Sequence, residues 1–153
     1  MAMEKHEVEN ILQACACANL RTVSRSLTQL YNQLLQATDL KITQYYMLVN
    51  IYQYKKLSIS ELGEVMMLEQ TTITRNVNVL IKNNFVHVEK DERDSRSKCV
   101  SLTSVGIEKL YEATPIWMQV QGKIEREIGT SNYHHLLRTL KQVQKIITHY
   151  EDM

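Results

Sequence analysis

The stretch between residues 57 and 102 changes the period of its apolar residues, and no other feature of the chain constrains the fold as strongly. Ser58 and Glu61 have the Ser-x-x-Glu spacing of a capping box, so we expect a helix to begin there. After a short break, residues 70–84 repeat apolar groups at helical spacing. Valines then alternate with polar residues on both sides of the polar run 91–98, which indicates a β-hairpin. A helix, a short turn, a second helix and a hairpin predict a winged helix-turn-helix.

The rest of the chain has the pattern of helices. Only 4 Gly and 1 Pro occur among 153 residues, too few for a turn-rich all-β architecture. Apolar spacing predicts one unbroken first helix over residues 7–37, a buried helix from about residue 41 to the lysines at 55–56, and two helices after Thr103 that are separated by Gly129. We therefore expect a mostly α fold with a small β-hairpin.

The overall charge does not indicate a partner. Lys and Arg total 18 against 17 Asp and Glu, a net charge of +1, so a DNA-binding prediction depends on where the charges lie. No stretch approaches the roughly 20 apolar residues of a membrane span, and the first residues lack the order of a secretory signal. We expect a cytoplasmic protein without membrane contact, whose 3 Cys are free thiols.

Helix 70–84 has an apolar stripe and an opposite face that carries only polar side chains. The stripe is predicted to consist of Ile73, Val77, Leu80 and Ile81. At about 100° per residue, the side chains opposite the stripe, none of them acidic, are those of Thr71, Arg75, Asn78 and Lys82. Such a face suits base edges and phosphates, because Arg can read guanine and Asn can read adenine. The simpler interpretation is the solvated face of any amphipathic helix.

The hairpin tip, residues 91–98, carries three cations and three acids. It is either a solvated turn or a wing whose arginine enters the narrow, electronegative minor groove beside the second helix. A winged helix can also be a protein-interaction module that binds no specific DNA. An acid-free helix face combined with a wing arginine favours the DNA-binding alternative.

Two motifs in these segments resemble the MarR (multiple antibiotic resistance regulator) family, and the resemblance covers nearly the whole chain. One is Asp94-Ser95-Arg96, followed by Leu102-Thr103 and Gly106; the other is the run Thr71-Thr72-Ile73-Thr74-Arg75-Asn76. The resemblance implies that Arg96 enters the minor groove and that Asp94 braces the wing. It also implies a homodimer on a pseudo-palindromic DNA operator, usually a repressor that a small ligand or an oxidant releases.

The resemblance also implies the organisation of the chain. Residues 1–153 would form a single domain, with dimerisation helices at 7–37 and 104–153 and the DNA-binding winged helix-turn-helix at 41–103. The residues expected to contact DNA are Gln70, Thr71, Thr72, Thr74, Arg75, Asn78, Lys82, Arg93, Arg96 and Lys98.

Two positions depart from the family pattern. The family usually has Gly where Asn84 stands, but Asn tolerates the left-handed conformation at a helix end, so Asn84 is still expected to end its helix. It often has Gly where Met67 stands, in the turn between the two helices, so the geometry of that turn is left open.

Cys17 and Tyr31 resemble residues of the organic-hydroperoxide-sensing branch of this family, in which the cysteine is oxidised and the tyrosine bonds to it. A further tyrosine of that branch is replaced here by Ile42. On one helix, Cys17 and Tyr31 would share a face but lie about 21 Å apart, so they could meet only across a dimer with antiparallel first helices. The alternative is that Cys15 and Cys17 are small apolar fillers of a dimer core.

Three tyrosines crowd the helix that ends near residue 55: Tyr45, Tyr46 and Tyr52. Core packing explains most of the aromatic content of the chain. The family, however, takes small and often phenolic ligands in an aromatic-lined cleft, so these three side chains are candidate ligand residues.

We expect neither a metal site nor catalysis. A metal site would need His134 and His135 together with His6 or His149, but adjacent His point to different faces of a helix. The sequence shows no Ser/His/Asp arrangement, no Gly-rich phosphate loop and no recognisable carboxylate motif, so neither an enzyme nor a cofactor is expected.

Overall fold

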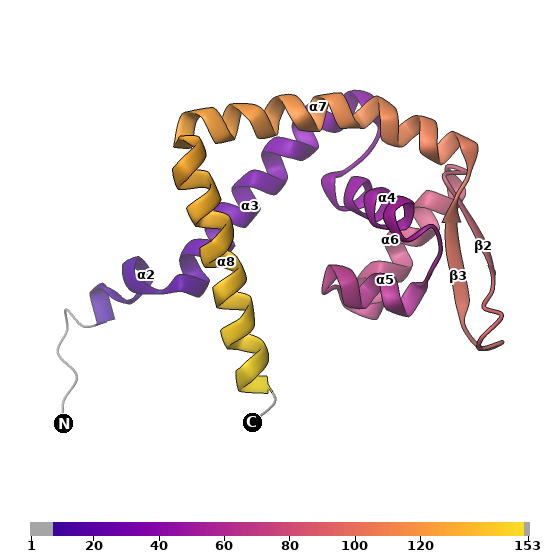
Figure 1. Cartoon of the computed structure of the whole chain (residues 1–153), viewed down its shortest axis with the longest axis horizontal. Coiled ribbons are helices and arrows are strands. Elements are labelled where there is room, and N and C mark those ends of the chain that lie inside the picture. The colour runs from indigo at the N-terminus through magenta and orange to yellow at the C-terminus, as the bar shows by residue number, and fades with distance from the viewer. Residues whose placement is uncertain (1–7, 152–153) are drawn as a thin grey trace. The chain divides into compact units, whose positions relative to one another are not determined.

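The computed structural model describes residues 8–151 of the chain (Figure 1). The elements are, in order, α2 (Ile11–Ala14), α3 (Ala16–Leu34), the 3-10 helix η1 (Leu35–Thr38), α4 (Ile42–Tyr54), β1 (Leu57–Ser58), α5 (Ile59–Met66), α6 (Gln70–Lys82), β2 (Val86–Lys90), β3 (Lys98–Leu102), α7 (Ser104–Ile128) and α8 (Thr130–Glu151). The chain divides into two compact units, and the boundary lies within α7, between Thr114 and Pro115. The prediction of a mostly α fold with a small β element is confirmed.

The prediction of one unbroken first helix is wrong. Cys15 has an extended backbone, with φ −76° and ψ 114°, and separates α2 from α3. The side chain of Asn19 makes this break tolerable, because its Nδ2 donates to the backbone oxygens of Leu12, Gln13 and Cys15 at 3.1, 3.2 and 2.8 Å. Apolar spacing alone does not reveal a break whose freed carbonyls bond to a side chain. Residue 7, the predicted start, lies outside the described residues.

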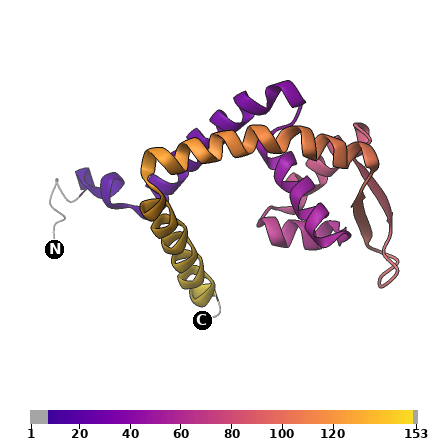
Figure 2. The same ribbon diagram turned by 45° about the horizontal axis from the view of Figure 1, so that its top comes forward.

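The winged helix has its own apolar core. Helices α4, α5 and α6 gather beside the β2–β3 hairpin, which projects from them in both views (Figure 1 and Figure 2). The side chains in this region that are less than 2% exposed are Met47, Leu48, Ile51, Leu62, Ile73, Val77, Leu80, Cys99 and Val100. Burying one Leu or Ile stabilises a fold by about 1.5–3 kcal/mol, so this region buries enough apolar surface to position its own elements.

The sheet has three strands rather than the two of the predicted hairpin. Its order is β1-β3-β2, with both pairs antiparallel. The added strand β1 pairs Leu57 with Val100 and Ser58 with Cys99. Two residues are too few to show an alternating pattern, and Ser58 is also the N-cap of α5, so this strand could not be predicted from the sequence.

The second unit consists of the rest of α7 and all of α8. α7 continues through Pro115 and ends at Ile128, and Gly129 follows with φ 89°, as its predicted role at the helix end requires. No side chain of α8 is buried. None of the helices in the described part of the chain is long and apolar enough to cross a membrane.

Candidate nucleic-acid interface

The helix that precedes α6 begins and ends with specific hydrogen bonds. At the start of α5, the Ser58 hydroxyl accepts a hydrogen bond from the Glu61 N–H at 3.0 Å, and Glu61 Oε2 accepts one from the Ser58 N–H at 2.7 Å. The predicted capping box is therefore confirmed. At the other end, Met67 has a left-handed backbone with φ 50°, and Leu68 N–H donates to the Gly63 carbonyl at 2.9 Å. Met67 thus forms the turn that family members often make with Gly.

Helix α6 buries one face and exposes the other. Ile73, Val77 and Leu80 are at most 1% exposed, as predicted, but Ile81 is 42% exposed. The prediction for Ile81 is wrong because it lies about 80° from Ile73 around the axis, at the edge of the buried stripe. The last residue of α6 is Lys82, and Asn83 is its C-cap. Asn84 follows in the expected left-handed conformation with φ 58°, and Phe85 N–H donates to the Leu80 carbonyl, which terminates the helix.

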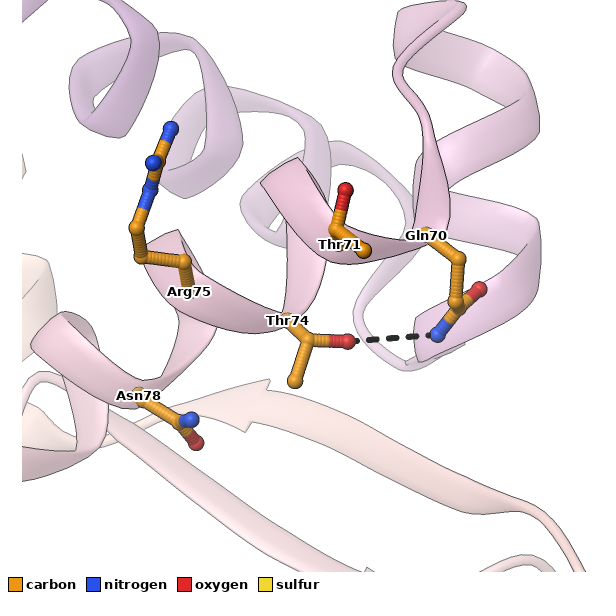
Figure 3. Close-up of a pocket in the computed structure, with 5 residues that line it drawn as sticks. All are labelled: Gln70, Thr71, Thr74, Arg75 and Asn78. Carbon is orange, nitrogen blue, oxygen red and sulfur yellow. Dashed lines mark hydrogen bonds between the residues drawn. The ribbon is translucent and has the colours of Figure 1, made fainter.

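The exposed face of α6 collects most of the residues that were predicted to contact DNA. Five of them line one shallow pocket: Gln70, Thr71, Thr74, Arg75 and Asn78. Figure 3 shows Gln70 bonded to Thr74, at 3.3 Å between Nε2 and Oγ1, and the Arg75 guanidinium extending away from that pair. Lys82 is also exposed, whereas Thr72 is half-buried. Residues 70–82 contain no acid, so this surface is neutral or positive along its length.

The wing turn is closed by Asp94. Its carboxylate accepts a hydrogen bond from the Arg96 N–H at 3.0 Å and another from the Ser97 hydroxyl at 3.3 Å. The Ser97 N–H donates to the Asp94 carbonyl, and the Asp91 N–H donates to the Ser97 carbonyl, each at 2.9 Å. The side chains of Arg96 and Lys98 are exposed on this turn. The structure therefore brings Asp94 and Arg96 together at the tip of the hairpin.

Arg93 lies differently from the other predicted DNA contacts. Its guanidinium bonds to both carboxylate oxygens of Asp91, at 3.2 and 2.9 Å, and reaches Glu61 on α5 at 3.3 Å. These bonds hold the pKa of Asp91 far below its usual range. Nothing in the sequence connects Arg93 to Glu61, because the two residues are 32 positions apart.

The base of the wing packs against the start of α7. The Thr103 hydroxyl donates to the Asn84 carbonyl at 2.6 Å and accepts from the Gly106 N–H at 2.9 Å. Thr103 N–H donates to the Phe85 carbonyl, and a Cβ on Gly106 would overlap the oxygen of that same carbonyl. The Leu-Thr-x-x-Gly motif therefore joins the end of α6 to α7, and position 106 has room only for glycine.

The three tyrosines proposed for a ligand cleft differ in their surroundings. Tyr45 is 4% exposed, and its hydroxyl lies 3.2 Å from the Thr114 hydroxyl. The Tyr52 hydroxyl lies 3.1 Å from that of Tyr111, a bond that raises the pKa of Tyr111. Tyr46 is 41% exposed. Of the three, Tyr52 lines a shallow pocket, together with Ile51, Lys55, Ser101, Leu102 and Ile107.

Cys17 and Tyr31 both belong to α3. Cys17 is exposed near the start of the helix, and Tyr31, near its end, is 6% exposed. The helix is continuous between them, so their separation remains about 21 Å along the axis. The other candidate thiol, that of Cys15, is half-buried at the break before α3.

No group of three or more His, Cys, Asp or Glu side chains within residues 8–151 is arranged to hold a metal ion. His134, His135 and His149 lie on α8. His6, which the alternative metal site invoked, lies outside the described residues.

Comparison with known proteins identifies the fold and the family. The sequence profile of the MarR family matches residues 40–98. The Staphylococcus aureus (strain USA300) HTH-type transcriptional regulator SarZ is 33% identical over 100 residues, which cover 65% of this chain and 68% of SarZ. The Bacillus subtilis (strain 168) organic hydroperoxide resistance transcriptional regulator is 28% identical over 90 residues, 59% of this chain and 61% of that protein.

A solved structure extends the similarity to nearly the whole chain. The crystal structure of the M. tuberculosis transcriptional regulator MosR in complex with DNA has a TM-score of 0.74 and 30% sequence identity, and the match covers 87% of this chain and 98% of MosR. The protein therefore belongs to the MarR family, whose members are transcriptional regulators rather than enzymes.

Proposed function

We propose that this protein regulates transcription by binding double-stranded DNA, with α6 in the major groove and Arg96 in the adjacent minor groove. The observation that carries the proposal is the acid-free face of α6 beside a wing whose turn is closed around Arg96. Arg75 and Asn78 have the geometry to read guanine and adenine, and the threonines and Lys82 can bond to phosphates. The DNA complex of the similar regulator MosR supports this assignment.

The test is a binding-site selection from random duplex DNA, followed by substitutions. Arg75→Ala should cost about 1–3 kcal/mol and relax the base preference if Arg75 reads a base. Arg96→Ala should weaken binding chiefly at A·T-rich flanks, where the minor groove is narrow. Arg138→Ala on α8 removes the same charge far along the sequence and should leave the preference unchanged. If the selection enriches no sequence, the protein-interaction alternative is favoured instead.

We propose that the active form is a homodimer. The apolar side chains of α3 repeat at alternating steps of three and four residues and are 38–56% exposed: Leu20, Val23, Leu27, Leu30 and Leu34. This spacing is the seam of a coiled-coil-like contact. α8 likewise exposes Leu136, Leu137, Ile146 and Ile147. A second copy fits both faces, and two recognition helices would then read half-sites about one helical turn, roughly 10 bp, apart on a pseudo-palindromic operator.

Light scattering tests the dimer. The wild type should have twice the 17.9 kDa mass of one chain. Leu27→Asp places a charge in the seam and should give a monomer that binds its operator poorly. Gln29→Asp adds the same charge on the opposite side of α3 and should stay dimeric. A wild type that is monomeric at micromolar concentration would contradict the proposal.

We further propose that the regulator is a repressor that an oxidant or a small phenolic ligand releases. In the oxidant case, a hydroperoxide converts the Cys17 thiol to a sulfenic acid and is itself reduced to the alcohol. Tyr31 could approach that sulfur only from a second copy whose α3 runs antiparallel, so the chemistry requires the dimer. The hydroperoxide regulator of Bacillus subtilis is a relative, which supports this choice.

Hydroperoxide should release the operator from the wild type and from Cys15→Ser, but not from Cys17→Ser. Mass spectrometry should locate one added oxygen on Cys17. If the wild type keeps its DNA under hydroperoxide, Cys17 is a filler of the dimer core, and phenolic ligands that bind near Tyr45, Tyr46 and Tyr52 become the inducers to test.

A further inference from the structure

Asp91 is a nearly buried carboxylate at the start of the wing turn, only 7% exposed. A buried charge is costly unless it is paired and hydrogen-bonded. Arg93 meets this need, because its backbone N–H, Nε and one terminal nitrogen all donate to Asp91, at 2.9, 3.2 and 2.9 Å. Arg93 therefore has a structural partner in the protein itself.

Glu61 connects this pair to the helix-turn-helix. The same carboxylate that caps α5 through the Ser58 N–H also accepts from Arg93, and both interactions lower the pKa of Glu61. An exposed ion pair contributes little to stability by itself. Here, however, the planar guanidinium reaches two carboxylates at once, one on the wing and one on α5, and this fork geometry fixes direction as well as distance.

We infer that Arg93 is a positioning residue, and that Asp91, Arg93 and Glu61 form a clamp that holds the wing at a fixed angle to α5. This role rests on the proposed function: Arg93 contacts no DNA itself and instead determines where the side chain of Arg96 points. The link is short, because the Asp91 N–H bonds to the Ser97 carbonyl and the Arg96 N–H bonds to Asp94. A shift of Asp91 therefore moves the turn that carries Arg96.

Glu61→Gln separates the clamp from simple electrostatics. Gln still accepts a hydrogen bond from the Ser58 N–H, so the cap of α5 is kept. Removing an acid from a DNA-binding protein should strengthen binding if charge alone matters. The clamp predicts the opposite, an affinity loss of about tenfold, within the range for one lost contact. Glu64→Gln, one turn further along α5, removes the same charge outside the clamp and should not weaken binding. Equal or tighter binding by Glu61→Gln overturns the inference.

Arg93 is tested by a cycle with Arg96. If Arg93 positions Arg96, then Arg96→Ala costs little once Arg93 is already Ala, whereas independent contacts would add. Arg93→Lys keeps the charge but loses the fork, so it should bind as weakly as Arg93→Ala. The slope of log affinity against log salt should fall to the same value in Arg96→Ala, in Arg93→Ala and in the double variant, because all three lose the same cation on DNA, that of Arg96. A Lys that restores binding, or a double variant whose slope is lower than that of Arg96→Ala alone, overturns the inference.

Hydrogen exchange tests the clamp without DNA. In Glu61→Gln, the amides of Arg93 and Ser97 should exchange faster than in the wild type, while the amides of α6 keep their rates. Unchanged exchange in the wing contradicts the clamp even if the protein binds DNA. Faster exchange in a protein that selects no DNA sequence would support the clamp and contradict only the proposed function.

Discussion

The winged helix buries its apolar side chains, whereas the helices α3 and α8 expose most of theirs. Residues 42–102 enclose Met47, Leu48, Ile51 and other side chains with almost no exposure. In α8 no side chain is buried, and in α3 only Tyr31 is. The winged helix thus covers its own apolar surface, whereas the apolar surface of α3 and α8 is exposed to solvent in the single chain. The difference indicates that the winged helix is self-contained in one chain, whereas the exposed apolar side chains of α3 and α8 are those that the proposed dimer would cover.

Backbone strain distinguishes the two compact units of the chain. In residues 8–151, the non-glycine residues with positive φ are Asp39, Lys55, Met67 and Asn84, all in the first unit. Lys55 has φ 66° and ψ −44°, and Lys56 N–H bonds to the Tyr54 carbonyl, which is the geometry of a strained γ-turn. The second unit makes its tight connection with Gly129. Strained backbone conformations persist only where the surrounding packing holds them in place. The packing of the first unit therefore offsets the conformational cost of these four residues.

The two units should respond oppositely to the same substitution of glycine. Gly106→Ala pushes a Cβ into the Phe85 carbonyl oxygen, where backbone rather than a flexible side chain must move, and should cost about 3 kcal/mol or more. Gly122→Ala in the second unit meets only the end of the Arg126 side chain and should stabilise the helix by up to about 1 kcal/mol. Urea unfolding followed by circular dichroism measures both. Equal effects would contradict the distinction between the regions.

Leucine truncations should reveal which region depends on a second copy. Leu48→Ala empties a fully buried site and should cost about 2–5 kcal/mol at every protein concentration. Leu27, 38% exposed in the single chain, lies in the proposed dimer seam, so the cost of Leu27→Ala should appear mainly as a stronger concentration dependence of the unfolding midpoint. Unfolding curves measured over a roughly hundredfold range of protein concentration compare the two variants. A cost for Leu27→Ala that is the same at all concentrations would remove the argument for a second copy.

Acid should weaken the winged helix through the clamp. The folded pKa values of Asp91 and Glu61 are both lowered, chiefly by Arg93 for Asp91 and by the Ser58 N–H for Glu61. The unfolded chain therefore binds protons more readily, and the stability that these groups contribute is complete above their unfolded pKa values of about 4 and is lost as pH falls below them.

Unfolding midpoints measured between neutral pH and about pH 2 should fall steeply in the wild type. The fall should be shallower in Arg93→Ala, where Asp91 loses its main partner and Glu61 keeps only its hydrogen bonds to Ser58. Glu64→Gln, which removes a carboxylate outside the clamp, should keep the wild-type dependence. Identical acid dependence in Arg93→Ala and the wild type would show that the clamp contributes nothing to stability.

Local signals predicted the parts of the fold that local bonds determine. The Ser-x-x-Glu spacing marked the start of α5, Asn84 marked the end of α6, and alternation marked β2 and β3. Their hydrogen bonds join residues that are near in sequence, or repeat with a period that the sequence displays.

Features that depend on one particular side-chain bond or on a partner distant in sequence were not predicted. The break at Cys15 depends on the Asn19 side chain, and β1 exists because β3 offers it a partner. The bond between Arg93 and Glu61 could not be predicted, because the two residues lie on different elements and 32 positions apart. The exposed face of α6 was predictable because helical geometry alone sorts its side chains by direction.

The smallest expected effects come from the left-handed positions, and they sharpen the contrast in strain. Met67→Gly keeps the left-handed conformation but removes its steric cost, which is about 1–2 kcal/mol for a non-glycine residue. The Met67 side chain is 77% exposed, so its loss removes little buried surface. Glycine also raises the entropy of the unfolded chain by up to about 1 kcal/mol, so the net gain should be about 0.5 kcal/mol.

Asn84→Gly should gain less than Met67→Gly, because Asn already tolerates φ 58°. Glu64→Gly, inside α5, is the control for the flexibility of glycine and should cost about 1 kcal/mol, since its backbone is helical. Gly129→Ala, at φ 89°, should destabilise the second unit for the reason that Met67→Gly stabilises the first. If Met67→Gly is as costly as Glu64→Gly, then the turn at Met67 is not strained, and the first unit does not offset strain with its packing.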